Sequence, residues 1–172
     1  MKHLIFLFVL SSTTLFAQQE VDYSSHVTTL DSTLESLYSV ISGEKGEARD
    51  WDLFRYLFHK DAKLIPTSKT KDGKFDASFI TPDGYIERAG TWLVENGFHE
   101  VEIHRSTQTF GNIAQVFSTY ESYRSKSDSE PFMRGINSIQ LLHDGHRWWI
   151  VNIYWQQETE DHPIPEAYLP KH

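Results

Sequence analysis

The chain has 172 residues, a formal net charge of −8 and no cysteine, and 39% of its residues are hydrophobic. That length is typical of one domain with a single core, and the acidic charge argues against binding nucleic acid or anionic lipid through the overall field. Without cysteine the chain cannot form disulfides, thiolate metal sites or a cysteine nucleophile.

The first 17 residues, MKHLIFLFVLSSTTLFA, have the pattern of a secretory signal peptide. Lys2 precedes a short apolar run over residues 4–10, and Ala17 is a small residue at the expected cleavage point. The apolar run is too short to cross a bilayer as a helix. We therefore expect cleavage after Ala17 and a periplasmic or secreted protein with no membrane attachment. The alternative is an N-terminal anchor that is never cleaved.

Two helices are predicted after an N-terminal lead over residues 18–27. Asp50 is a good N-cap for the second of them, over 51–58, which leads into a short strand ending at Pro66. The first, over 28–42, has one apolar stripe at helical spacing, formed by Leu30, Leu34, Leu37 and Ile41.

The third helix is marked at both of its ends. Thr81 is the expected N-cap, Pro82 occupies the first helical position, and Asn96-Gly97 ends the helix. Beyond Gly97 the apolar residues recur at every second position, which is typical of strands. Four strands are predicted, over 99–109, 113–123, 132–142 and 147–157.

These elements predict an α+β fold in which the helices cover one face of a curved antiparallel sheet. We take residues 28–157 as the domain. The segment 158–172, with three prolines, is expected to be an extended C-terminal tail.

Two-residue turns at Gly111-Asn112 and Asp144-Gly145 would fix the register of two hairpins. The register between the hairpins follows if Tyr123 pairs with Phe132. The predicted pairs are Arg105 with Ser118, Ile103 with Tyr120, Ser118 with Asn137, Tyr120 with Gly135, Asn137 with Asn152 and Gly135 with Tyr154.

This register places a polar row across the face of the sheet that the helices cover. The opposite face of the first of these strands carries Glu100, Glu102 and His104 and is expected to face solvent. The row consists of Arg105, Ser118, Asn137 and Asn152, with Tyr120 and Tyr154 beyond it.

The polar row has two interpretations. It can line a small-molecule cavity, because such cavities combine apolar walls with a few convergent polar groups. Alternatively, Arg105 pairs with a helix carboxylate and the amides satisfy one another, since an unpaired buried polar group costs about 1–3 kcal/mol. The outer face of the sheet is also expected to be apolar, with Trp149, Val151, Ile153, Trp155, Phe117 and Ile136. It is expected to form a homodimer, or else to be covered by the tail.

Four segments resemble the NTF2-like (SnoaL-like) superfamily, as an exported bacterial member. They are LFHKDAKLI (57–65), TPDGYIERAGTWLVENGFHEVEI (81–103), FGNIAQVFSTYESYR (110–124) and RGINSIQLLHDGHRWWIV (134–151). The resemblance covers residues 28–157 and implies an α+β cone, with three helices packed on a curved antiparallel sheet. The superfamily includes isomerases, dehydratases, cyclases and proteins that only bind or dimerise, so the fold alone implies no reaction.

The resemblance transfers few residue roles. Ketosteroid-isomerase-like members carry a carboxylate base just after the position matched by Asp61-Ala62, where this chain has Lys63–Pro66 and no acid. Their tyrosine donor lies on the first helix, where Tyr38 is the loose match. His59 and Asp61 correspond only by type to the His/Asp pair of dehydratase-like members, so no catalytic residue is assigned.

The first functional hypothesis is a cone cavity that binds a small, partly apolar ligand, with Arg105 meeting an anionic or carbonyl group. Any reaction would be isomerase- or lyase-like, and no cofactor or metal is expected, because no histidine spacing is typical of a zinc site. The alternative is a non-catalytic dimerisation or accessory module whose own side chains fill the cavity. The predicted ligand-binding residues are Arg105, Ser118, Asn137, Asn152, Tyr120, Tyr154 and Tyr38.

Overall fold

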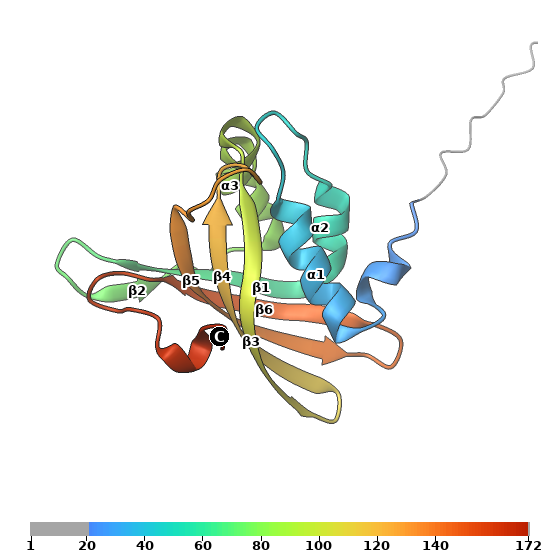
Figure 1. Ribbon diagram of the computed structural model, residues 1–172. Helices are drawn as coiled ribbons and strands as arrows, with labels where there is room; N and C mark the ends of the chain where they lie inside the picture. Colours follow the sequence, from blue (N-terminus) through green and yellow to red (C-terminus); the bar gives the residue numbers. More distant parts are fainter. Residues whose placement is uncertain (1–20, 172) are drawn as a thin grey trace, which may run out of the picture.

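The computed structural model describes residues 21–171, so the predicted signal peptide over 1–17 lies outside the described residues. As predicted, the fold is α+β, with three α-helices on one face of a curved sheet (Figure 1). The helices are α1 (Leu30–Ile41), α2 (Trp51–Leu57) and α3 (Pro82–Asn96), with short 3-10 turns η1 (Ser24–Val27) and η2 (Glu166–Tyr168). The strands are β1 (Phe58–Lys69), β2 (Phe75–Ala77), β3 (His99–Phe110), β4 (Ile113–Tyr123), β5 (Met133–His143) and β6 (Trp148–Gln157).

All six strands form one sheet in the order β2-β1-β6-β5-β4-β3. The pairs β3–β4, β4–β5 and β5–β6 are antiparallel, as predicted. The first strand extends three residues beyond the predicted end at Pro66, to Lys69. It pairs in parallel with β6 and antiparallel with β2, a short strand that the sequence did not indicate.

The predicted helix caps are confirmed. The Asp50 carboxylate accepts a hydrogen bond from Leu53 N at 2.8 Å, and the Thr81 hydroxyl accepts one from Gly84 N at 3.1 Å. These side chains satisfy backbone donors that the first turn of a helix leaves free. Gly97 ends α3 with φ = +70°, a conformation that glycine adopts without strain.

The β3–β4 hairpin has the predicted turn, but the β5–β6 hairpin does not. Phe110 pairs with Ile113 across Gly111-Asn112, and Arg105 pairs with Ser118 as expected. In the second hairpin His143 pairs with Trp148, so the loop has four residues, 144–147. The longer loop forms because the Asp144 carboxylate accepts hydrogen bonds from the backbone N–H groups of residues 146 and 147 and from the indole of residue 149, all at 2.7–2.9 Å.

Two β-bulges change which side chains face the helices. In β3, Glu102 pairs with Tyr120 and His104 with Thr119, so Ile103 is the extra residue. In β6, Asn152 pairs with Gln140 while Ile150 pairs with Leu141, so Val151 is the extra residue. One extra residue reverses the alternation of a strand on one side of the bulge.

Three predicted pairs are wrong. Ile103 does not face Tyr120, because Glu102 takes that position, and Glu100 and Glu102 turn toward the helices instead of solvent. In the β5–β6 hairpin the predicted pairs Asn137 with Asn152 and Gly135 with Tyr154 are also wrong, because the longer loop and the bulge together shift the register. Asn137 pairs with Trp155, and Gly135 pairs with Gln157. Across the middle of the sheet, the predicted pairs Ser118 with Asn137 and Tyr120 with Gly135 are confirmed.

The tail beyond β6 folds back on the outer face of the sheet, on the side away from the helices (Figure 1). Thr119 Oγ1 donates a hydrogen bond to the carbonyl of Tyr168 at 2.7 Å, and the rings of Phe117 and Tyr168 lie 5.0 Å apart. The tail therefore covers part of the apolar outer face, as one of the two interpretations expected. Within residues 21–171, no helix is long and apolar enough to span a membrane.

Candidate functional site

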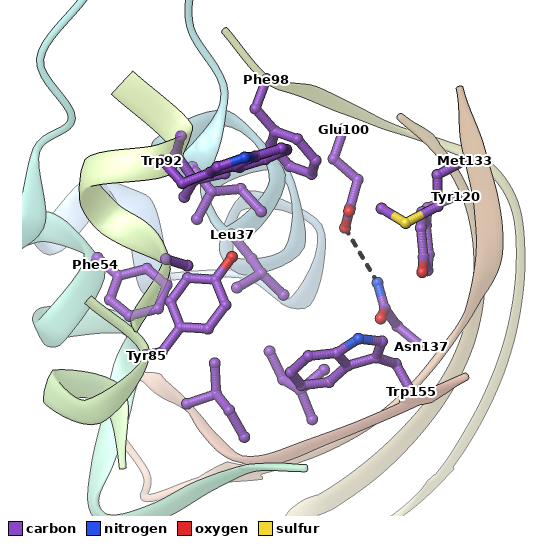
Figure 2. A pocket seen from close by; sticks show the side chains of 15 residues that line it. Leu37, Phe54, Tyr85, Trp92, Phe98, Glu100, Tyr120, Met133, Asn137 and Trp155 are labelled. Carbon is purple, nitrogen blue, oxygen red and sulfur yellow. Dashed lines mark hydrogen bonds between the residues drawn. The ribbon is translucent and has the colours of Figure 1, made fainter. Parts of the chain in front are cut away.

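A cavity of about 180 Å³ lies between the helices and the inner face of the sheet (Figure 2). Its volume is comparable to that of the apolar protein cavities of about 150 Å³ that take up one benzene molecule. Most of its walls are aliphatic or aromatic, and Asn137 and Glu100 are the polar groups at one side. The helices contribute Leu37, Ile41, Phe54, Tyr85, Ala89, Trp92 and Leu93 to the lining. The strands, with Phe98 just before β3, contribute Leu64, Phe98, Glu100, Tyr120, Met133, Asn137, Ile153 and Trp155.

Glu100 is the charged side chain of the cavity lining. Asn137 Nδ2 donates a hydrogen bond to Glu100 Oε1, and Ser122 Oγ donates one to Oε2, both at 3.3 Å. Figure 2 shows the carboxylate and the Asn137 amide facing each other across the polar side of the cavity. Glu100 also lines an open groove of about 920 Å³ between α1 and β3, so it lies between the cavity and this groove.

The apolar surroundings raise the pKa of Glu100 to about 7, because burial disfavours the charged carboxylate. The hydrogen bonds from Asn137 and Ser122 act in the opposite direction and are weaker in effect. Burial also raises the pKa of Tyr38, Tyr85 and Tyr120 well above the usual value, so their hydroxyl groups stay protonated. Of these four groups, the Glu100 carboxyl is therefore the one that can exchange a proton around neutral pH.

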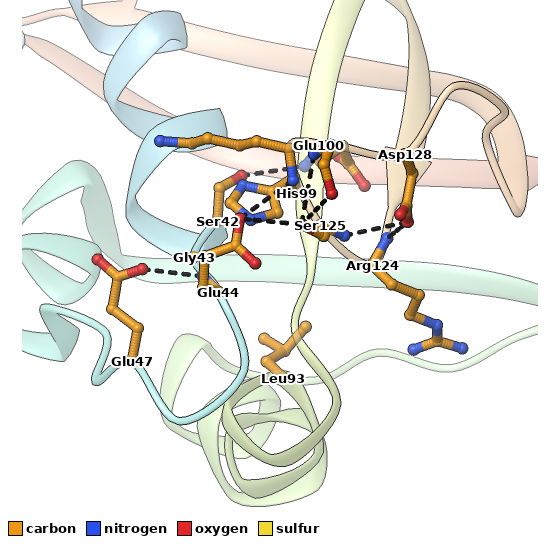
Figure 3. A network of polar contacts seen from close by, with 12 residues as sticks. Ser42, Gly43, Glu44, Glu47, Leu93, His99, Glu100, Arg124, Ser125 and Asp128 are labelled. Carbon is orange, nitrogen blue, oxygen red and sulfur yellow. Dashed lines mark hydrogen bonds and ion pairs between the residues drawn. The ribbon is translucent and has the colours of Figure 1, made fainter.

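A network of contacts fixes the start of β3, where Glu100 lies (Figure 3). Glu100 N donates a hydrogen bond to Ser42 Oγ at 3.0 Å, and Gly43 and Phe98 exchange two backbone hydrogen bonds. His99 is buried, and its Nε2 lies 3.2 Å from a carboxylate oxygen of Glu44. These contacts anchor β3 to the segment after α1 and thereby hold Glu100 beside the cavity.

Behind Asn137, hydrogen bonds connect a chain of polar side chains that leads away from the cavity. Asn137 Nδ2 donates to Tyr38 Oη at 3.1 Å, and Tyr38 Oη lies 2.6 Å from Ser118 Oγ. Ser118 donates to a carboxylate oxygen of Glu102. Arg105 closes the chain, because its guanidinium donates to Glu102 and, at 2.5 Å, to Asp31 on α1. This chain satisfies Arg105, Ser118 and Asn137 of the predicted polar row through direct hydrogen bonds. Asn152 lies outside the chain, and its buried Oδ1 has no hydrogen-bond partner among the described residues.

The structure separates the seven predicted ligand-binding residues into three groups. Asn137 and Tyr120 line the cavity. Tyr38, Ser118 and Arg105 belong to the polar chain behind it, and Arg105 pairs with two carboxylates, one of them on a helix. Asn152 and Tyr154 lie on the outer face, opposite Gln140 and Ser138, because the bulge at Val151 reverses the alternation there.

Three residues that were expected on the opposite face of the sheet line the cavity instead. Ile153 and Trp155 take the inward positions of β6, and Glu100 takes the inward position at the start of β3. A bulge leaves no clear mark in a strand sequence, since the residue types stay the same. Gly135 makes room for the ring of Tyr120, its partner on β4. A β-carbon at Gly135 would lie 2.5 Å from the Tyr120 hydroxyl, so only glycine leaves room for that ring.

Among residues 21–171, no group of three or more His, Asp or Glu side chains is placed to hold a metal ion.

Comparisons with known proteins agree on the fold. No protein-family model matches the sequence, and no curated protein matches it significantly. Solved structures do match. A protein of unknown function with a cystatin-like fold from Nostoc punctiforme PCC 73102 aligns with a TM-score of 0.56 at 10% identity, over 74% of this chain and 87% of its own.

Two further solved structures extend this similarity. An NTF2-like protein of unknown function from Silicibacter pomeroyi DSS-3 gives a TM-score of 0.53 at 15% identity, over 75% of this chain and 92% of its own. A candidate ketosteroid isomerase from Parabacteroides distasonis ATCC 8503 gives 0.51 at 12% identity, over 76% and 88%. The chain therefore has the NTF2-like fold that the sequence predicted, and its cone encloses a small apolar cavity with one carboxyl group.

Proposed function

We propose that the protein binds a small, mostly apolar molecule in the cone cavity, with Glu100 and Asn137 as its polar contacts. The observation that carries this proposal is the position of the Glu100 carboxyl group, which faces an otherwise apolar cavity of about 180 Å³. That volume suits a ligand with a single ring. An anionic ligand is disfavoured, because Arg105 is paired with Glu102 and Asp31 and does not line the cavity.

The same carboxyl group provides the chemistry for a reaction. A general acid or base works best when its pKa lies near the working pH, and burial brings the pKa of Glu100 to about 7. The hydrogen bonds from Asn137 and Ser122 orient the carboxyl group, and the groove between α1 and β3 gives its proton a path to solvent. Any reaction would be a proton transfer of the isomerase or lyase type that needs no cofactor.

A thermal-shift screen with neutral single-ring compounds, such as phenol, indole and cyclohexanone, tests the binding proposal. We expect several of them to raise the melting temperature of the wild-type protein. Ala89→Phe fills the cavity from α3 and should abolish these shifts. Asn152→Ala, on the outer face, is the matched control and should retain them. If no compound stabilises the protein, or if Ala89→Phe leaves the shifts intact, the proposal fails.

We also propose that the protein is exported by a signal peptide over residues 1–17. A further proposal is homodimerisation through the outer face of the sheet. The tail leaves part of that face open near the β3–β4 hairpin. Phe110, Ile113 and Val151 are 85%, 58% and 36% exposed there and line one shallow groove. Exposed apolar surface of this kind favours association, and a second copy of the chain can supply a matching face.

A further inference from the structure

The charge at the cavity wall is that of a carboxyl group. Glu100 is the one charged side chain among the described residues that line the cavity, and no basic side chain lines it. The positive charge of Arg105, at the far end of the polar chain, is neutralised by Glu102 and Asp31. On its other side Glu100 meets a groove lined by charges of both signs, which include Glu35 and Glu47 as well as Arg105 and Lys126. A ligand in the cavity therefore meets one acidic and no basic side chain among the described lining residues, which favours a cation.

The walls that face Glu100 are rich in aromatic rings. Figure 2 shows Tyr85, Trp92 and Trp155 around the space that the carboxyl group faces. The faces of aromatic rings attract a cation by about 0.5–2 kcal/mol each, and most strongly where water is excluded. The full set of rings comprises Phe54, Tyr85, Trp92, Phe98, Tyr120 and Trp155.

We propose that the ligand of this cavity is a small cyclic or aromatic amine, whose ammonium group pairs with the Glu100 carboxylate while its ring fills the apolar walls. This inference rests on the proposed function and names the class of ligand for the same site. An ionised carboxylate in an empty apolar cavity is costly, and an ammonium group offsets that cost by charge pairing and hydrogen bonding. An anion would be repelled, and a neutral ligand would leave the carboxylate without a countercharge.

The inference predicts how binding depends on pH. Glu100 is faced by Tyr38 from α1, Tyr85 from α3 and Tyr120 from β4, whose raised pKa values keep them neutral. His99 and Glu102 flank it on β3, with Glu44 beyond His99. An ammonium ion binds the ionised form of Glu100, and the pKa of this group is about 7. Affinity for an amine should therefore rise about tenfold from pH 6 to pH 8, whereas affinity for a neutral isostere should not rise.

Isothermal titration calorimetry with benzylamine, benzyl alcohol and benzoate tests the inference, because these probes share one ring and differ in charge. At pH 8 we expect the wild-type protein to bind benzylamine at least tenfold more tightly than benzyl alcohol and to reject benzoate. Glu100→Gln should remove the preference for the amine but retain benzyl alcohol. Asn152→Ala is the matched control and should behave like the wild type.

The outcomes separate this inference from the proposed function. Suppose that benzyl alcohol binds the wild-type protein but not Ala89→Phe, and that benzylamine binds no more tightly than benzyl alcohol at pH 6 or pH 8. The amine inference is then overturned, while the binding proposal stands. If none of the three probes binds the wild-type protein, both are overturned. The pH dependence is measured on the wild-type protein, so the inference can be judged even if Glu100→Gln folds poorly.

Discussion

At the scale of single residues, Glu100 combines two properties that a structural carboxylate seldom has. Its side chain faces an apolar cavity, and its hydrogen bonds from Asn137 and Ser122, both at 3.3 Å, are long for contacts to an ionised group. The raised pKa follows from this imbalance, because desolvation outweighs the hydrogen bonds. The same imbalance makes Glu100 a cost to the free energy of folding at neutral pH.

This cost predicts a pH dependence of stability. In the unfolded chain Glu100 ionises at its ordinary pKa of 4.5, and in the folded chain at about 7. Between these values the folded state keeps a proton that the unfolded state has lost, so the free energy of unfolding falls as pH rises from 4.5 to 7 and then levels off. The expected loss is about 3 kcal/mol.

Urea denaturation of the wild-type protein and Glu100→Gln at several pH values between 4 and 8 measures this effect. Glutamine stays neutral throughout, so the variant should lack the fall that Glu100 causes, while the other carboxyl groups contribute equally to both proteins. A difference between the two proteins that does not change with pH would contradict the assignment.

At the scale of secondary-structure elements, local sequence patterns predicted the helix caps and one hairpin turn correctly, but they did not predict the bulges. The caps at Asp50 and Thr81 and the turn at Gly111-Asn112 were predictable, because each depends on residues a few positions apart. The pairing of Ser118 with Asn137 also followed from the alternation of β4 and β5. The extra residues Ile103 and Val151 were not predictable, because a bulge depends on how distant elements pack against a strand.

The two bulges explain why the sequence predicted only part of the candidate site. Asn137 and Tyr120 were placed correctly, since neither β4 nor β5 contains a bulge between them. Asn152 and Glu100 each lie on the face of the sheet opposite to the predicted one. Asn152 follows the bulge at Val151, and Glu100 precedes the bulge at Ile103. The resemblance to a known fold predicted a cavity in the right place but could not predict which of its residues would be acidic.

The bulge in β6 predicts different effects for two neighbouring aromatic residues. Trp155 faces the cavity, so Trp155→Ala should enlarge it, weaken ligand binding and lower the free energy of unfolding by about 3 kcal/mol. Tyr154 lies on the outer face and is 47% exposed, so Tyr154→Ala should change the free energy by less than about 1 kcal/mol. Chemical denaturation of both variants checks this. A larger loss for Tyr154→Ala would mean that the register of β6 is the one predicted from alternation alone.

At the scale of the whole molecule, the sheet separates two environments. The helices and the inner face enclose the cavity, while the tail and η2 cover the outer face around Phe117 and Thr119. The part near the β3–β4 hairpin stays open, with Ile113 and Phe110 exposed. Ligand binding and self-association would therefore use opposite faces of the sheet and should be separable by mutation.

Light scattering tests the proposed association. We expect the wild-type protein to have the mass of a dimer and Ile113→Glu to have that of a monomer, because a charge buried without a partner at an apolar interface is costly. Thr91→Glu, at an exposed position on α3, is the control and should leave the mass unchanged. Ligand binding should be the same in all three proteins. A wild-type protein that is monomeric at high concentration would rule out this interface.

The account depends most on the Glu100 carboxyl group lying in an apolar cavity, and its pKa measures this directly. Carbon-13 NMR of glutamate side chains, with Glu100→Gln to identify the resonance, follows the ionisation of this group from pH 4 to pH 9. The account predicts a midpoint near 7, since burial raises the pKa to about that value. A midpoint near the ordinary value of 4.5 would show that the carboxyl group is solvated, and would contradict its placement in an apolar cavity and the pH dependence predicted for amine binding.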